Sequence, residues 1–140
     1  MSLRFTHAAP QPNWVEAAVV ELELAHLNDD GSLSGTYTTG MKVDSGADLS
    51  LLGIEAAVNL GIDLSEPRYR ASDVTGIVPG SALRTAEAPV LVRLCDVWIE
   101  IPIRFVLLPV TVRPLLGRRG VFDRFTFAFR NQPSELLAGR

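Results

Sequence analysis

Residues 44–48 read Asp-Ser-Gly-Ala-Asp and are the stretch of this chain whose residue types are best suited to chemistry. The apolar Val43 precedes Asp44, and leucines resume at positions 49, 51 and 52, as expected for a carboxylate at the end of a buried strand. A serine hydroxyl can hydrogen-bond a carboxylate, and a glycine lets backbone N–H groups approach it. The pattern predicts a carboxylate that is held by its neighbours and not solvated. A solvated surface turn is the alternative, because Asp, Ser and Gly are common in turns.

Two segments before this stretch would position Asp44. Apolar and polar residues alternate over residues 14–27, which predicts a strand, and Asn-Asp-Asp-Gly at 28–31 predicts a hairpin turn. The chain then returns through residues 37–39 as a second strand. We therefore expect Asp44 at the end of a hairpin strand.

The chain after the motif predicts a mixture of strands and short helices. A short helix is expected over residues 54–61, with Gly61 as its end. Residues 68–84 predict a long hairpin with the apolar, glycine-bracketed tip Gly-Ile-Val-Pro-Gly at 76–80. Apolar residues at an exposed tip usually meet a ligand or a partner chain, and a poorly ordered turn is the alternative. Further strands are predicted over 89–112 and 126–129, with a second short helix over 121–125.

Length and charge narrow the class of protein. The 140 residues suit one domain, predicted over residues 14–129, between a loose arm at 1–13 and a polar, frayed tail at 130–140. The chain has 13 basic and 16 acidic residues, a net charge of −3 and no basic stripe, which argues against nucleic acid as a partner. No stretch has the pattern of a membrane span or a signal sequence, so we expect a cytoplasmic protein without a membrane partner.

The chain offers few residues for a metal. Its single cysteine, Cys95, has no Cys or His cluster nearby and is expected to be a small core residue. His26 with Asp29 and Asp30 offers a metal corner as an alternative, but an acid-rich turn beside a lone histidine is typical of a solvated turn. We expect no metal and no cofactor.

Three elements in this order resemble the retropepsin-like aspartic proteases. Residues 44–50 are similar to the active-site loop of that family, and residues 75–80 fall where the family has its flap. Pro-Leu-Leu-Gly-Arg at 114–118, followed by Phe-Ala-Phe at 127–129, is similar to its Gly-Arg element and closing strand. The resemblance covers residues 35–129. It implies a mainly β fold, a closed single-lobe β-barrel with one or two short helices, and peptide-bond hydrolysis.

That chemistry needs two carboxylates that share a proton. This chain has a single Asp-Ser-Gly triplet, since the similar triplet Asp-Asp-Gly at 29–31 has no hydroxyl residue. A chain of 140 residues is also too short to contain a second lobe. The resemblance therefore implies a homodimer acting on a peptide or protein substrate, with Asp44 from each subunit at a two-fold axis.

The resemblance also implies a role for each motif residue. Asp44, Ser45 and Gly46 would be catalytic: the first activates water, the second ties the two active-site loops together, and the third keeps the backbone open to substrate. Asp48 would pair with Arg118 and brace the loop, unless both are unrelated surface charges. The residues expected to bind substrate are Ala47, Asp48, Leu52, Gly76, Ile77 and Val78.

Two other functions stay open at this point. Ser45 stands where many members have threonine, and weaker activity, or a binding and dimerisation module that keeps the fold, is the first alternative. The second treats Ser45 as the nucleophile of a serine hydrolase, because Asp-Ser-Gly echoes trypsin-like signatures. Only His7 and His26 could serve as its base, and both lie in the N-terminal quarter.

Overall fold

The computed structural model describes residues 2–5, 19–78, 80–131 and 134–139. Within these ranges the chain is mainly β, with ten strands and one helix. The strands are β1 (Ser2–Phe5), β2 (Val19–Ala25), β3 (Tyr37–Val43), β4 (Ser50–Gly53), β5 (Ala71–Val78), β6 (Ser81–Leu94), β7 (Val97–Val106), β8 (Leu115–Leu116), β9 (Thr126–Asn131) and β10 (Ser134–Gly139); the helix is α1 (Ile54–Leu60).

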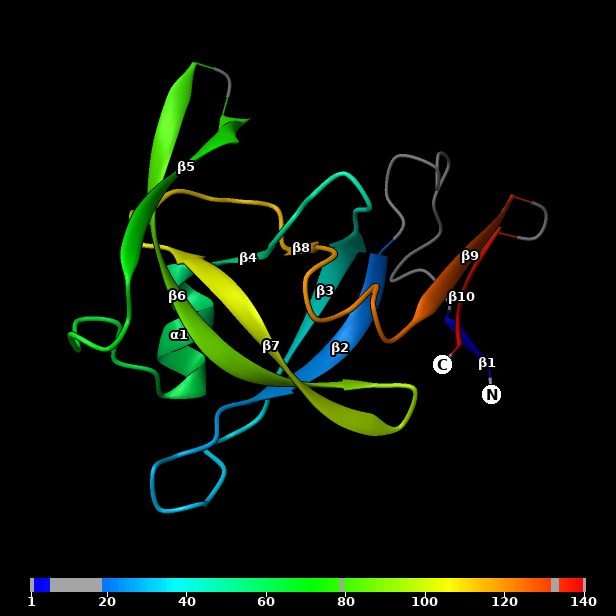
Figure 1. Ribbon diagram of the computed structural model, residues 1–140, viewed down its shortest axis with the longest axis horizontal. Helices are drawn as coiled ribbons and strands as arrows, with labels where there is room; N and C mark the ends of the chain where they lie inside the picture. The colour runs from blue at the N-terminus through cyan, green and yellow to red at the C-terminus, as the bar shows by residue number, and fades with distance from the viewer. Residues whose placement is uncertain (1, 6–18, 79, 132–133, 140) are drawn as a thin grey trace.

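Six of the strands close into a ring. In the order β2, β3, β8, β4, β7 and β6, each strand pairs with the next, and β2 also pairs with β6. The length of β6 makes the closure possible, because residues 81–86 pair with β5 while residues 91–93 pair with β2. The β5–β6 hairpin consequently extends beyond the ring, at the upper left of Figure 1.

Alternation along the strands builds the core inside this ring. In β7, Ile99, Ile101, Ile103 and Phe105 are buried, whereas Trp98 before them and Glu100 between the first two are exposed. Burial of such apolar side chains is the main driving force of folding. The same core cluster contains side chains of β2, β3 and α1, among them Leu22, Leu24, Met41 and Leu60.

The predicted hairpin that leads to the motif is confirmed for the strands Val19–Ala25 and Tyr37–Val43, while residues 14–18 of the predicted first strand lie outside the described residues. β2 and β3 pair antiparallel, with Val19 opposite Lys42. Gly31 in the intervening turn has φ of 86°, and its N–H donates to the carbonyl of Asn28 at 3.0 Å. The hydroxyl and the backbone N–H of Ser32 donate to the carboxylate of Asp30, and these hydrogen bonds lower the pKa of Asp30. That carboxylate is therefore engaged within its own turn.

The predicted helix at 54–61 is confirmed as α1. It ends at Gly61, which has φ of 73° and donates its N–H to the carbonyl of Val58, while the N–H of Ile62 donates to Ala57 at 2.9 Å. Such a left-handed glycine satisfies the last carbonyls of a helix and returns the chain to the core. No helix in the described ranges is long and apolar enough to span a membrane.

Residues 2–5 and 134–139 are strands where a loose arm and a frayed tail were expected, and residues 6–13 of the expected arm lie outside the described residues. The two strands, β1 and β10, pair antiparallel, and β10 also pairs with β9. Figure 1 shows the two chain ends beside one another in this three-stranded sheet, next to the ring. The pairing joins opposite ends of the chain, so neither end shows it in its own sequence.

Two local predictions are also wrong. Residues 121–124 form hydrogen-bonded turns instead of a second α-helix, with the N–H of Phe125 donating to the carbonyl of Val121 at 2.9 Å. Cys95 is a half-buried turn residue at the edge of the core. With Asp96 it forms the two-residue connection between β6 and β7, and both residues have positive φ, 53° and 59°.

Candidate active site

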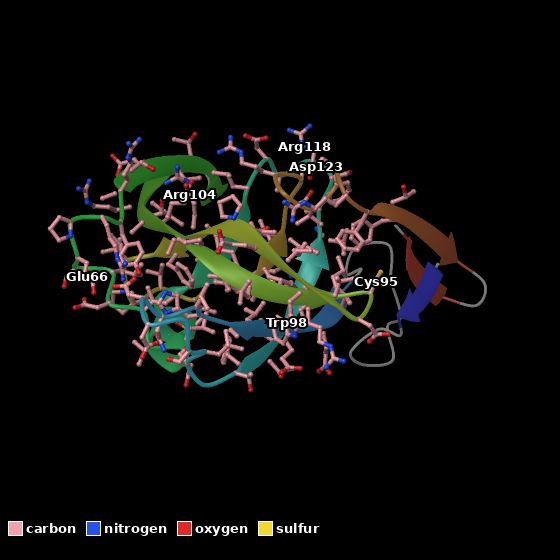
Figure 2. All side chains as sticks on the ribbon, turned by 60° about the horizontal axis from the view of Figure 1, so that its bottom comes forward. Glu66, Cys95, Trp98, Arg104, Arg118 and Asp123 are labelled. Atoms are coloured by element: carbon pink, nitrogen blue, oxygen red, sulfur yellow. The ribbon has the colours of Figure 1, made fainter. Side chains whose placement is uncertain are left out.

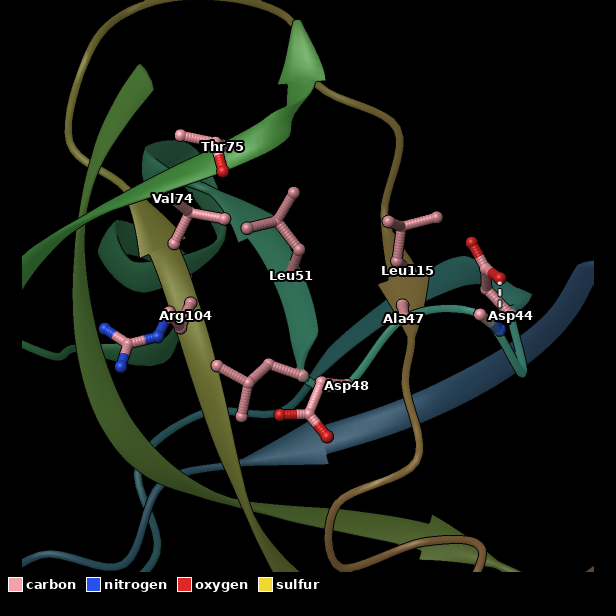
Figure 3. Close-up of a pocket in the computed structure, with 10 residues that line it drawn as sticks. Asp44, Ala47, Asp48, Leu51, Val74, Thr75, Arg104 and Leu115 are labelled. Atoms are coloured by element: carbon pink, nitrogen blue, oxygen red, sulfur yellow. Dashed lines mark hydrogen bonds between the residues drawn. The ribbon is translucent and has the colours of Figure 1, made fainter.

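Asp44 follows directly on Val43, the last residue of β3. Its backbone N–H donates to the carbonyl of Leu116 at 3.0 Å and so extends the parallel pairing of β3 with β8. Its side-chain Oδ1 accepts a hydrogen bond from the N–H of Gly46 at 2.9 Å, the dashed line in Figure 3. Asp44 is half-buried and the neighbouring Ser45 is exposed. The carboxylate is thus held by a backbone donor of its own loop.

The loop is fixed by the segment that follows β8. Gly117 donates its N–H to the hydroxyl oxygen of Ser50, a fully buried residue, at 3.0 Å. The next two N–H groups, of Arg118 and Arg119, donate to the carbonyls of Ala47 and Asp48, each at 3.0 Å. Three consecutive backbone donors therefore hold the motif loop against the Gly-Arg segment.

Asp48 and Arg118 lie together, as the resemblance implies, with Asp48 Oδ1 3.5 Å from Arg118 Nη2. Arg119 takes part as well, because its Nη2 is 3.2 Å from Asp48 Oδ2. The side chains of all three are at least half exposed, with 65% for Asp48. Exposed pairs of this kind are worth about 0–1 kcal/mol. The backbone contacts and Ser50 therefore brace the loop more strongly than the ion pairs do.

A pocket of about 380 Å³ opens beside the motif. Its lining consists of motif residues, apolar residues of β4 and β8, part of β5 and one arginine: Asp44, Gly46, Ala47, Asp48, Leu49, Leu51, Val74, Thr75, Arg104 and Leu115. Figure 3 shows Asp44 at one end, Arg104 at the other, and Leu51, Val74 and Leu115 between them. The arrangement places a carboxylate at the end of a largely apolar cleft.

The residues expected to bind substrate fall in different places. Ala47 and Asp48 line the pocket, but Leu52 is 1% exposed and lies in the core, so its assignment to the groove is corrected. Leu51 lines the pocket instead, because neighbouring residues of a strand point to opposite faces. Gly76, Ile77 and Val78 belong to β5, and their side chains lie outside what the structure describes. The β5 residues that line the pocket are the preceding Val74 and Thr75.

Sequence reasoning missed several lining residues, and Arg104 is the charged one among Leu49, Leu51, Val74, Thr75, Arg104 and Leu115. The only signal was a charged residue on the mixed face of β7, which is common on solvated strands. Its side chain is 18% exposed here, and no hydrogen-bond partner is found for its buried Nε within the described residues.

A second pocket, also about 380 Å³, lies on another part of the ring and is lined by residues such as His26, Asp29, Arg68 and Glu87. Asp29 accepts a hydrogen bond of 2.9 Å from Arg68, which raises the pKa of Arg68. Asp29 is thus paired with an arginine, and the metal corner considered for His26 gains no support from this geometry.

Comparison with known proteins bears on the fold. No family model and no curated protein matches the sequence. The chain is similar to the crystal structure of a retropepsin-like aspartic protease from Rickettsia conorii, with a TM-score of 0.61 and 18% identity over 98% of both chains. It also matches EIAV protease in complex with the inhibitor HBY-793, with a TM-score of 0.45 and 22% identity over 71% of this chain and 80% of that one.

A single-lobe ring of strands with an Asp-Ser-Gly loop at its rim defines the class of fold. The chain has a retropepsin-like fold, matched over nearly its whole length by the Rickettsia protein. The predicted fold class is confirmed.

Proposed function

We propose that the chain is a homodimeric aspartic endopeptidase in which two copies of Asp44, one from each subunit, activate a water molecule. The observation that carries the proposal is the Asp44 carboxylate, which lies at the end of an apolar cleft within a retropepsin-like fold. Apolar walls that end in a few convergent polar groups are typical of binding sites for peptides and small molecules.

The requirement for two carboxylates argues for the dimer. One ionised carboxylate takes a proton from water, and a neutral one donates to the scissile carbonyl. The proton is shared by the pair, so activity should fall once pH rises far enough to ionise both. Because each chain supplies one Asp44, two copies must meet with their motif loops facing each other. The exposed Ser45 would then face the partner's loop.

The two sides of the cleft receive roles in this proposal. An extended peptide would lie over Leu51 and Leu115 and under β5, where Val74 and Thr75 form the opposite wall. The β5–β6 hairpin, with Gly76, Ile77 and Val78 near its tip, would close over the bound peptide as a flap. Backbone carbonyls and N–H groups near Gly46 and Ala47 would hold the peptide main chain.

The test is Asp44→Asn in purified protein. Asparagine keeps an oxygen that can accept the hydrogen bond from Gly46, so the loop should keep its shape. We expect peptide cleavage to fall by at least about a hundredfold, as for loss of a catalytic acid or base. Asp123→Asn, at an exposed aspartate outside the pocket, is the matched control and should retain activity.

Cleavage that survives in Asp44→Asn would remove the mechanism. A wild-type protein that is monomeric at micromolar concentration and inert to aspartic-protease inhibitors would instead favour a binding or dimerisation module. Light scattering beside a cleavage screen from acidic to neutral pH separates these outcomes.

A further inference from the structure

Arg104 joins three strands at the far end of the pocket from Asp44. From β7, its Nη1 donates to the hydroxyl of Ser72 in β5 and lies 3.4 Å from the hydroxyl of Thr85 in β6. Its Nη2 is 3.4 Å from Oε1 of Glu87, also in β6. Figure 3 shows the guanidinium pointing away from Asp44, so the stem of the side chain faces the pocket and the charged end faces the hairpin.

The contacts of Arg104 lie at the root of the β5–β6 hairpin. Thr85 is fully buried and donates its own hydroxyl to the carbonyl of Ser72 at 3.1 Å. Val74 and Thr75, the pocket-lining residues of β5, follow Ser72 by two and three positions. The register of β5 with β6 is regular up to Thr75 and shifts between Thr75 and Val78. Arg104 therefore holds the part of the hairpin that precedes this irregularity.

Stability alone does not account for this arginine. Its Nε is buried and has no hydrogen-bond partner among the described residues, and an unsatisfied buried donor is destabilising. Its ion-pair partner Glu87 is 36% exposed, which weakens the charge interaction through solvent screening. An apolar side chain could pack beside Val74 and Leu51 without either penalty. What the guanidinium supplies is a planar fork that reaches hydroxyls on two strands at once.

We propose that Arg104 is a positioning residue that fixes the root of the β5–β6 hairpin over the pocket and thereby sets the affinity for an extended peptide. This inference rests on the proposed function. Arg104 touches neither Asp44 nor the reacting atoms; it acts through Ser72 and Thr85 on the wall formed by Val74 and Thr75. Figure 2 shows Arg104 on the same side of the molecule as Arg118, with Trp98 toward the opposite side.

Three variants separate the contacts. Arg104→Met removes the guanidinium and keeps most of the stem, Arg104→Lys keeps the charge near Glu87 without the fork, and Ser72→Ala removes only the acceptor in β5. Arg93→Met is the matched control, because Arg93 is an arginine of β6 whose contacts, Glu23 and Asp96, lie outside the pocket. Circular dichroism and amide exchange of the buried Ile101 check that each variant is folded.

Two readouts are measured on the full chain. The first is amide hydrogen exchange of Val74 and Thr75 without peptide, and the second is the Kd of a statine-containing peptide that mimics the tetrahedral intermediate. We expect Arg104→Met to speed exchange at these amides and raise the Kd about tenfold, which corresponds to loss of charged hydrogen bonds. Arg104→Lys should restore little of the lost affinity. The double variant Arg104→Met with Ser72→Ala should bind the peptide no more weakly than Arg104→Met alone, since Arg104 and Ser72 act through one contact.

Each outcome decides the inference. Unchanged exchange or an unchanged Kd in Arg104→Met, or full rescue by Arg104→Lys, would overturn it while the endopeptidase proposal stands. Equal effects in Arg93→Met would show a general loss of stability and overturn it as well. If the wild-type protein neither cleaves peptides nor binds the statine peptide, the proposed function fails and the inference fails with it.

Discussion

Gly117 brings the Gly-Arg segment into close backbone contact with the motif loop. A Cβ at this position would lie 2.4 Å from the carbonyl oxygen of Leu49 and 3.0 Å from that of Ala47. Backbone atoms of a loop that is hydrogen-bonded to its neighbour cannot give way as the far end of a flexible side chain can. We therefore predict that Gly117→Ala lowers the free energy of unfolding by about 2–3 kcal/mol, as overpacking of a tight site does. Urea unfolding followed by circular dichroism measures it.

Gly35→Ala is the matched control for this prediction. Nothing lies within 4 Å of a Cβ at Gly35, so we expect a change within about 0.5 kcal/mol. A Gly117→Ala protein as stable as the control would show that the two loops do not approach as closely as the structure has them.

Some contacts of the motif loop could be predicted from the sequence and others could not. The resemblance of short motifs predicted that Asp48 and Arg118 lie together, which the structure shows, and it singled out Asp44 as the candidate catalytic residue. The buried hydrogen bond from Gly117 to Ser50 was not predicted, although it braces the loop more strongly than the exposed ion pairs do. Exposure decides the strength of these contacts, and exposure depends on the folded surroundings.

At the scale of elements, the β6–β7 turn carries strain that a substitution can relieve. Cys95 and Asp96 both have positive φ, and a left-handed conformation disfavours residues other than glycine by about 1–2 kcal/mol. We predict that Asp96→Gly raises the free energy of unfolding by about 0.5–1 kcal/mol, since a two-residue hairpin with positive φ at both positions favours glycine there. The substitution also removes the exposed ion pair of Asp96 with Arg93, at 3.6 Å, which offsets part of this gain in stability. Thermal unfolding measures the gain.

Asp96→Ala is the control in this case. It removes the same ion pair but keeps a Cβ at positive φ, so its stability should not exceed that of the wild type. A stabilising effect in both variants would assign the gain to the removed charge, and equal stability of Asp96→Gly and the wild type would show no strain.

Elements with local signals were predictable, and elements formed by distant pairing were not. The helix at 54–61 and the hairpin before Asp44 follow from periodicity and turn residues within a dozen positions. β1 and β10 depend on each other across nearly the whole chain. Arg104 was missed for the same reason, because Ser72, Thr85 and Glu87 come together only when β5, β6 and β7 pair. The groove was predicted to contain Leu52, and the structure has Leu51 there, because the four residues of β4 are too few to show from the sequence which side chains face the core.

At the scale of the whole molecule, the candidate active site and the β1–β10–β9 sheet belong to separate parts of the fold. The ring presents Asp44 at its rim, and the β1–β10–β9 sheet lies beside the ring with β1 and β9 at its two edges. Sheet edges carry unpaired N–H and C=O groups that readily pair with another chain.

A shared active site makes a quantitative prediction for mixed dimers. When wild-type chains and Asp44→Asn chains are unfolded, mixed in equal amounts and refolded, random pairing leaves about a quarter of the dimers with two Asp44 carboxylates. Cleavage per total chain should therefore fall to about a quarter of the all-wild-type value, whereas sites contained in single chains would retain about half. Mixing with Asp123→Asn chains should leave activity unchanged and corrects for losses in refolding. A linear dependence of activity on the wild-type fraction would assign the reaction to one chain and refute the dimeric mechanism.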